Sequence, residues 1–339
     1  MPISEQEIQK HAADIAKLRD TLNGVLFGQQ NLIDLTITGL LARGHILLEG
    51  LPGLGKTELV TSLAKALRIE TKRIQFTPDL LPGDITGNPV LQETDTGREF
   101  VFQPGPLFAN LVLADEINRA SPKTQSALLE AMQERQVTVL GEAHPLPTPF
   151  FVLATQNPIE LEGTYPLPEA QLDRFLFKLE VPRNNAETLE RIVKHRELGI
   201  EPEVPAVMDA ATLTNIMNAV REIYLPDVVA NYIARLVDST HSGQSQTAER
   251  IRFGASPRAA LSMASAAKAR ALIDGRINAS FEDVKAVAVP VLLHRIVLEY
   301  QARIDGASSR NIIENLLKEI PTQNLDTPAS LKEKQATPA

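Results

Sequence analysis

The chain has 339 residues, 43% hydrophobic and 22% charged, which suits a globular protein with one core-bearing domain and a second, smaller one. Its net charge of −8 argues against a nucleic-acid-binding surface, and the absence of cysteine excludes disulfides and thiolate metal sites. The first residues show no basic stretch before an apolar one, and no run approaches about 18 apolar residues, so we expect a cytoplasmic protein without a membrane span.

Two helices are predicted before the first strand. Ser4 and Glu7 have the spacing of a capping box, in which each residue bonds the backbone of the other at a helix start. Apolar residues then recur at helical spacing to about Thr21, and a second helix is predicted over Asn31–Arg43. The segment Val25–Gln29 separates the two helices.

The segment Gly50–Thr57 matches the pattern G-x-x-x-x-G-K-[ST]. It follows an apolar run, His45–Glu49, predicted to be a buried strand, and precedes a predicted helix, Glu58–Leu67. In this context the pattern predicts a site in which backbone N–H groups and the helix N-terminus hold the phosphates of ATP. Lys56 is expected to reach the β- and γ-phosphates, and Thr57 to bind Mg²⁺. The candidate nucleotide-binding residues are Gly50, Pro52, Gly53, Leu54, Gly55, Lys56, Thr57 and Glu58.

Two interpretations remain open for Val25–Gln29. The segment is either a connector or, because it lies just upstream of the glycine-rich loop, a wall of the adenine pocket. The candidate residues for such a wall are Phe27, Gly28 and Gln29.

An insertion is predicted after the next strand, Lys72–Phe76. Thr77–Gly105 is rich in proline and glycine turn signals and contains two short predicted strands, Asn88–Gln92 and Arg98–Phe102. A hairpin therefore interrupts the expected alternation of strands and helices. It is either a surface insertion or a projecting loop that contacts a substrate or partner.

An apolar strand, Asn110–Glu116, ends in two acidic residues. After a glycine-rich phosphate loop, this pattern predicts that Asp115 contributes to Mg²⁺ binding and that Glu116 is the general base for the attacking water. The alternative is that the acidic pair caps the following helix. That helix is predicted to begin after Ser121 at its N-cap and to run to about Gln136.

A second hairpin is predicted over Val137–Thr148, followed by a buried strand, Phe150–Thr155. Asn157 comes just after this strand, where a polar side chain could reach the γ-phosphate; the alternative is a turn former before proline. A short helix, Glu169–Asp173, and a last strand, Phe175–Val181, complete the predicted sheet.

The remaining chain is predicted to be helical. A helix over Asn185–Leu198 precedes the proline-containing segment Gly199–Pro205, which is the predicted domain boundary. Pro321–Ala339 is polar and proline-rich and is predicted to be disordered. The predicted domains are residues 1–200 and 206–320, followed by the tail. The predicted C-terminal helices are Ala210–Ile223, Asp227–Ser239, Pro257–Ile273, Phe281–His294 and Arg310–Leu317.

Four motifs in this order resemble those of the MoxR family of AAA+ ATPases. They are Gly-Leu-Pro-Gly-Leu-Gly-Lys-Thr, Leu-Ala-Asp-Glu-Ile-Asn-Arg-Ala, Ala-Thr-Gln-Asn-Pro and Leu-Asp-Arg-Phe, and the resemblance covers roughly residues 5 to 320. It implies an α/β fold: a P-loop AAA+ α/β/α domain with a parallel sheet, followed by a smaller all-α lid domain. It also implies ATP and Mg²⁺ as ligands.

The same resemblance implies roles for single residues. Asn157 would be sensor 1, Arg174 the arginine finger supplied to a neighbouring subunit, and Arg258 the sensor-2 arginine. Without the resemblance, Arg174 would be a surface salt-bridge residue and Arg258 a solvated charge, although an arginine is unfavourable at a helix N-terminus. The two hairpins resemble the helix-2 insert and the pre-sensor-1 insertion of the clade that includes magnesium chelatase and the minichromosome-maintenance helicases.

The resemblance implies Mg²⁺-dependent ATP hydrolysis by a homo-oligomeric ring, a hexamer, that remodels a client protein. The implied partner carries a von Willebrand factor A domain. A residue-level reason for the ring is that the P-loop side shows no obvious arginine in cis. The alternatives are a nucleic-acid motor, disfavoured by the acidic balance and the lack of a basic-aromatic stretch, and a chelatase-type metal-insertion motor.

Overall fold

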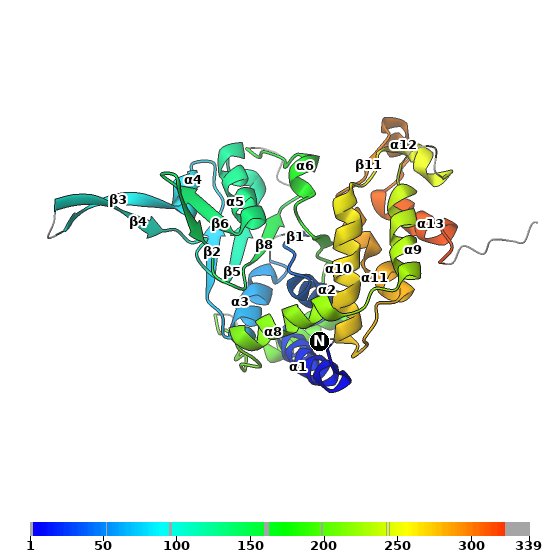
Figure 1. The fold of residues 1–339 in the computed structure, drawn as a ribbon, viewed down its shortest axis with the longest axis horizontal. Coiled ribbons are helices and arrows are strands. Elements are labelled where there is room, and N and C mark those ends of the chain that lie inside the picture. Colours follow the sequence, from blue (N-terminus) through cyan, green and yellow to red (C-terminus); the bar gives the residue numbers. More distant parts are fainter. Residues whose placement is uncertain are drawn as a thin grey trace, which may run out of the picture.

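The centre of the molecule is a five-stranded parallel sheet with the strand order β2-β5-β8-β1-β9 (Figure 1). The computed structural model describes residues 3–51, 53–94, 97–158, 163–197, 199–241, 243 and 245–322. The strands of the sheet are β1 (Ile46–Glu49), β2 (Thr71–Gln75), β5 (Leu111–Asp115), β8 (Phe151–Gln156) and β9 (Phe177–Glu180).

The sheet has a hydrophobic core on each face, because successive side chains of a strand point to opposite sides. In β1, Ile46 and Leu48 belong to one core and Leu47 to the other. Apolar side chains on both faces of a strand are expected for the central strands of a parallel sheet. The first core includes α1 (Glu5–Val25), α2 (Gln30–Leu41) and α3 (Lys56–Leu67), and the second includes α4 (Pro82–Thr86) and α5 (Pro122–Glu134).

Helices begin at the predicted caps, whereas some helix ends and some short helices differ from the prediction. The capping box forms, since the Glu7 N–H donates to Ser4 Oγ at 3.3 Å and the Ser4 N–H to Glu7 Oε2 at 3.0 Å. Helix α1 continues past the predicted end to Val25, which is buried in the core. Helix α5 stops at Glu134 because Arg135 adopts a left-handed conformation (φ 54°). The patterns did not indicate the short helices α4 and α12 (Tyr300–Ile304).

The two predicted hairpins are present. Strands β3 (Gly87–Thr94) and β4 (Gly97–Pro104) form a long antiparallel arm that projects from the body (Figure 1). Strands β6 (Gln136–Val139) and β7 (Glu142–Pro145) form the second hairpin. The two hairpins contact each other, since the rings of Phe102 and His144 stack with centroids 4.0 Å apart.

The C-terminal part is a helical lid with one small addition. Strands β10 (Ile251–Phe253) and β11 (Val297–Leu298) form a two-stranded sheet among the lid helices. Only helices were predicted here, because two strands so far apart in the sequence leave no local signal of their pairing. No helix among the described residues is long and apolar enough to cross a bilayer. The further helices are α6 (Glu169–Leu172), α7 (Ala186–His195), α8 (Ala210–Glu222), α9 (Asp227–Asp238), α10 (Pro257–Ile273), α11 (Phe281–Leu292) and α13 (Ser309–Glu319).

The lid shares a core with the sheet. Helix α10 packs against α1 and α2 as well as against α8, α9 and α11, and all belong to the first core. Small buried residues such as Ala259 and Ala267 allow this close packing. The segment before α8 is tied to α3, since the N–H groups of Val207 and Met208 both donate to Ala66 O. The boundary at residues 199–205 therefore stays a prediction. The predicted tail lies almost wholly outside the described residues.

His45 joins three elements at the start of β1. Its side chain is 5% exposed; Nδ1 accepts a bond from the Val152 N–H at 3.0 Å, and Nε2 lies 3.1 Å from Met132 O at the end of α5. Because Nδ1 is an acceptor, the proton of the neutral ring sits on Nε2. Burial, and then the positive charge of Arg135, lower the pKa of His45 from 6.5 to about 4.

We expect the stability of the chain to fall as the pH is lowered from 6.5 toward 4. In this window the unfolded chain binds a proton at His45 that the folded chain excludes, and the shift corresponds to roughly 3 kcal/mol when complete. The stability difference between the parent and His45→Gln, measured by urea unfolding, should shrink as the pH falls. His195→Gln, on an exposed residue, is the control. A difference that stays constant from pH 7 to pH 4.5 would contradict the assignment.

Candidate active site

The glycine-rich loop has the backbone that phosphate binding requires. Gly53 and Gly55 have φ angles of +79° and +83°, a left-handed region that glycine adopts without strain. Helix α3 begins immediately afterwards at Lys56, whose Nζ donates to Gly50 O at 2.9 Å across the loop. The loop N–H groups and the first turn of α3 are thus available to an anion. Pro52 lies outside the described residues.

A cavity of about 390 Å³ opens beside this loop. It forms where β1, β2, β5 and β8 end, because the carboxyl ends of parallel strands meet at one edge of a sheet. It brings together the predicted loop residues, the acidic pair and the predicted sensor. The lining residues are Gly53, Gly55, Lys56, Thr57, Glu58, Arg73, Gln75, Asp115, Glu116 and Asn157.

Thr155, at the end of β8, positions both acidic residues. Its hydroxyl donates to Asp115 Oδ1 at 2.6 Å and accepts a bond from the Glu116 N–H at 2.8 Å. Thr155 is fully buried, so its rotamer is held by packing. No local pattern in the sequence marks this residue.

Glu116 has a strained backbone (φ 57°, ψ 51°) that turns its side chain into the cavity. Its carboxylate accepts bonds from Gln75 Nε2 at 2.8 Å and from Arg119 Nη1 at 3.1 Å. Its side chain makes no capping bond, and the next α-helix is capped by Ser121. The alternative that the acidic pair caps the following helix is therefore wrong.

Arg73, on the edge strand β2, is an arginine in cis in this cavity. Its Nη2 lies 2.7 Å from Asp115 Oδ2 and also donates to Gln75 at 2.9 Å. The expectation that the P-loop side lacks an arginine is therefore wrong. Alternation along β2 places Arg73 and Gln75 on one face, but only the pairing with β5 sets Gln75 opposite Asp115. That register cannot be read from local sequence.

The charges of the cavity are coupled. Burial lowers the pKa of Lys56, and the carboxylates of Asp115 and Glu116 partly offset this effect. The oxygen donors of Thr57 and Asp115 suit Mg²⁺, and Asp115 already pairs with a cation, the Arg73 guanidinium. Within the described ranges no group of three or more His, Cys, Asp or Glu side chains could hold a metal by itself. This fits an ion that takes few protein ligands and completes its shell with phosphate and water.

The segment before α2 is attached to both the loop and α7. Gln29 Nε2 donates to Leu54 O at 2.9 Å, and a Cβ at Gly28 would lie only 2.5 Å from Thr188 Oγ1. The Phe27 ring packs under Arg191, whose guanidinium carbon is 4.8 Å from the ring centroid. Gly28 and Gln29 line a second cavity of about 500 Å³ between α2, β9 and α11. Their role toward adenine stays a prediction.

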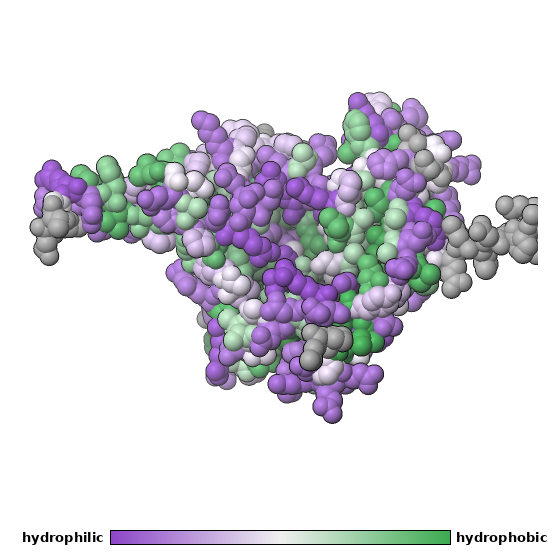
Figure 2. Space-filling view, in the orientation of Figure 1, coloured by the Kyte–Doolittle hydropathy of each residue, from purple (hydrophilic) through white to green (hydrophobic). Residues whose placement is uncertain are grey.

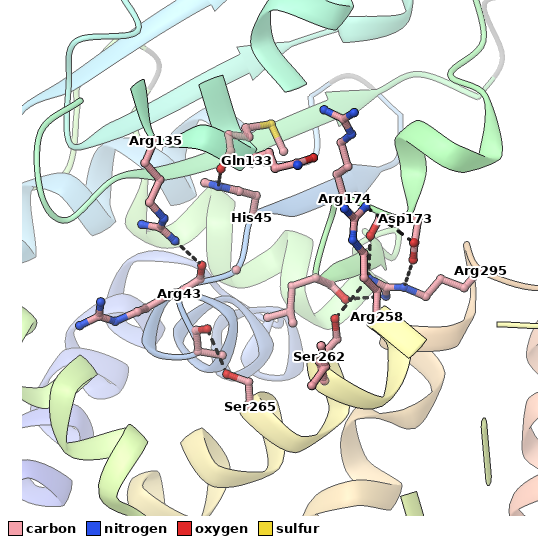
Figure 3. Close-up of a pocket in the computed structure, with 15 residues that line it drawn as sticks. Arg43, His45, Gln133, Arg135, Asp173, Arg174, Arg258, Ser262, Ser265 and Arg295 are labelled. Carbon is pink, nitrogen blue, oxygen red and sulfur yellow. Dashed lines mark hydrogen bonds and ion pairs between the residues drawn. The ribbon is translucent and has the colours of Figure 1, made fainter. Parts of the chain in front are cut away.

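Arg174 and Arg258 are not in the P-loop cavity. Both line a third cavity, of about 310 Å³, between the sheet domain and α10 (Figure 3). Arg174 Nη1 donates to Leu129 O at 3.1 Å, and Arg258 Nη1 lies 3.9 Å from Asp173 Oδ2. One chain therefore brings these two arginines together but separates them from Lys56.

Comparisons with known proteins agree with this geometry. Residues 45–177 match the ATPase family associated with various cellular activities (AAA), and residues 243–316 match the AAA lid domain. Chaperone MoxR1 of Mycobacterium tuberculosis is 42% identical over 301 residues, 87% of this chain and 79% of that protein. The uncharacterised protein YeaC of Bacillus subtilis is 42% identical over 313 residues, 91% of this chain and 95% of that protein.

The fold is also similar to a crystal structure of a candidate ATPase from Cytophaga hutchinsonii. The TM-score is 0.86 with 40% identity, over 94% of this chain and 97% of that one. The likeness to the named relative extends over most of both chains, and the phosphate loop shares its cavity with the acidic pair. The chain therefore belongs to the MoxR family of AAA+ ATPases.

Proposed function

We propose that the protein forms a homo-oligomeric ring, a hexamer, that hydrolyses ATP in the presence of Mg²⁺ and uses the energy to remodel a client protein. The observation that carries the proposal is the separation of two half-sites. Lys56 and Glu116 line the P-loop cavity, whereas Arg174 and Arg258 line another cavity of the same chain. A complete site would combine the first cavity with the arginines of a neighbouring subunit.

Five residues of the P-loop cavity have a definite task in this proposal. Lys56 binds the β- and γ-phosphates, which replace its present bond to Gly50 O. Glu116 accepts a proton from the attacking water, and Asn157 bonds the γ-phosphate or that water. Thr57 and Asp115 would hold Mg²⁺, which neutralises charge developing on the phosphates. An ion held by Asp115 would compete with Arg73 for this carboxylate.

In the ring, Arg174 of one subunit would place its positive charge beside the phosphoryl group that is transferred in the neighbouring subunit. Arg174 has no carboxylate within 4 Å among the described residues, so its charge is available to an incoming anion. Steady-state phosphate release, with and without chelation of Mg²⁺, tests the hydrolysis itself. Sedimentation with and without ATP tests the ring.

Client remodelling is supported by the projecting arm and by the likeness to a protein named as a chaperone. The arm carries exposed apolar side chains, including Leu91 (52% exposed) and Phe100 (68%), and Figure 2 shows apolar surface along it. Such surface on a segment away from the core indicates a binding role. We place a client there, with a partner containing a von Willebrand factor A domain as the second implied partner.

The double variant Leu91→Ser, Phe100→Ser should bind an unfolded polypeptide more weakly while its basal ATP hydrolysis stays close to that of the parent. Both side chains are exposed, so the loss removes apolar contact area without opening a core. Fluorescently labelled casein, titrated in an anisotropy assay, measures the affinity. Ile304→Ser, at an exposed apolar residue of α12, is the control. Unchanged casein binding with intact fold would remove the arm from the client site, and stimulation by DNA instead would favour a nucleic-acid motor.

A further inference from the structure

The two carboxylate oxygens of Asp115 have different kinds of partner. Oδ1 accepts a bond from the buried hydroxyl of Thr155 at 2.6 Å, whereas Oδ2 lies 2.7 Å from Arg73 Nη2. The side chain of Asp115 is 14% exposed, and that of Arg73 is 55% exposed. One oxygen is therefore held from inside the protein and the other by a cation that water reaches. Arg73 is the partner of Asp115 that can be exchanged.

A second acceptor keeps Arg73 beside this carboxylate. The same Nη2 atom donates to Gln75 Oε1 at 2.9 Å. The amide of Gln75 is oriented in turn, because its Nε2 donates to Glu116 Oε2 at 2.8 Å. Arg73 and Gln75 are two residues apart on β2, and alternation places both on one face of the strand. The guanidinium is thus positioned at Asp115 by hydrogen bonds as well as by charge.

Stabilisation of the fold is a weak reason for this pair. Ion pairs with an exposed partner contribute little to stability, and more than half of the Arg73 side chain is exposed on an edge strand. The pair instead lies in the cavity that contains Lys56 and Thr57. The carboxylate proposed to hold Mg²⁺ is therefore neutralised by an arginine of its own chain.

We propose that Arg73 is a counter-cation of Asp115 that competes with Mg²⁺ and sets the Mg²⁺ concentration at which the site takes up ATP with its ion. A guanidinium and a divalent ion at one carboxylate oxygen repel each other, and the repulsion is strong where water is partly excluded. Gln75 is a positioning residue, because its oxygen holds Arg73 in place. The inference rests on the proposed role of Asp115 toward Mg²⁺.

Loss of the guanidinium should have two opposite effects. Without Arg73, the charge of Asp115 is uncompensated and repels the phosphates, so ATP alone should bind more weakly. The ion, however, no longer has a competitor, so a lower Mg²⁺ concentration should suffice for tight binding. A merely structural role of Arg73 would produce neither combination, because damage to the cavity weakens the binding of nucleotide and ion together.

The experiment titrates a fluorescent, non-hydrolysable ATP analogue into the full-length protein, first with a chelator and then at increasing Mg²⁺. Arg73→Gln is the main variant, since it removes the charge and keeps a polar side chain on the edge strand. We expect the dissociation constant in chelator to rise about 5-fold and the Mg²⁺ midpoint to fall about 5-fold, the size expected for a half-exposed charge pair. The analogue binds Mg²⁺ in solution equally in every titration, so differences between variants come from the protein.

Three further variants make the result specific to Arg73. Arg73→Lys keeps the positive charge without the planar fork, and both values should lie between those of the parent and Arg73→Gln. Lys72→Gln removes a positive charge from the other face of β2, where Lys72 pairs with Glu70 at 3.3 Å, and should change neither value. Arg303→Ala, at an exposed lid residue outside the cavity, should also change neither.

The outcomes separate this inference from the proposed function. Analogue binding by the parent that does not respond to Mg²⁺ would contradict the proposed use of the ion, and the inference with it. If the parent responds, an unchanged or raised Mg²⁺ midpoint in Arg73→Gln, with the fold verified by circular dichroism, overturns the inference alone. A midpoint lowered equally by Lys72→Gln would assign the effect to net charge and would overturn it as well.

Discussion

Glu116→Gln should bind ATP with nearly the parent affinity and lose almost all turnover. The carboxamide has the shape of the carboxylate and can still interact with Gln75, but it cannot take a proton from the attacking water. General bases of this kind contribute roughly 10²–10⁴ in rate. Nucleotide affinity from a fluorescent ATP analogue and phosphate release at saturating ATP measure the two properties separately.

Two further variants make the Glu116 result specific. Lys56→Ala should show the opposite pattern, with weak nucleotide binding, because Lys56 is the cation of the phosphate loop. Glu282→Gln, on an exposed glutamate of the lid, should change neither property. Turnover by Glu116→Gln close to that of the parent would exclude Glu116 as the base and leave Asp115 and Glu58 as the carboxylates of the cavity to test.

Two inactive proteins, Arg174→Ala and Glu116→Gln, should regain ATP hydrolysis when they are mixed. Related arginine fingers contribute roughly 10³–10⁵ in rate, so each variant alone should be nearly silent. An Arg174→Ala subunit keeps its own Glu116, and a Glu116→Gln neighbour supplies Arg174. Some subunit interfaces in mixed rings then contain a complete active site. The structure supports this design because Arg174 and Lys56 line different cavities of one chain.

The mixing result needs proof that subunits exchange. Differently labelled variants that show energy transfer after mixing provide this proof, and Arg303→Ala mixed with Glu116→Gln is the matched control. If mixed rings form at every ratio of Arg174→Ala to Glu116→Gln and no hydrolysis returns, Arg174 does not complete a neighbour's site, provided that hydrolysis does not require every interface to be complete. Complete sites in these rings are never adjacent, because the Glu116→Gln neighbour is inactive at its own site, so rescue would also show that an isolated complete site hydrolyses ATP.

Much of the candidate site could be predicted because its residues belong to short local patterns. Lys56 and Thr57 follow a glycine-rich turn between a strand and a helix, and the acidic pair ends an apolar strand. The geometry of parallel strands then brings their ends to one edge of the sheet. Asn157 was predicted in the same way and lines the same cavity.

The residues that were missed depend on which segments become neighbours. Arg73 reaches Asp115 only because β2 pairs with β5 in one register, and Thr155 supports Asp115 only because β8 lies on the other side of β5. Arg135 enters a cavity whose walls come from α5, the start of β1 and α10. Local spacing carries no information on any of these neighbours, so the sequence alone could not indicate them.

The core that α10 shares with α1 and α2 holds the lid against the sheet domain. Tilting the lid away from these helices would expose their apolar faces to water, and about 400 Å² of new apolar surface would cost about 10 kcal/mol. That is comparable to the whole stability of a typical domain. The shared core therefore opposes separation of the lid from the P-loop face of the sheet. If the chain forms the proposed ring, we expect larger motions where no common core joins the parts, at the interfaces between subunits and in the projecting arm.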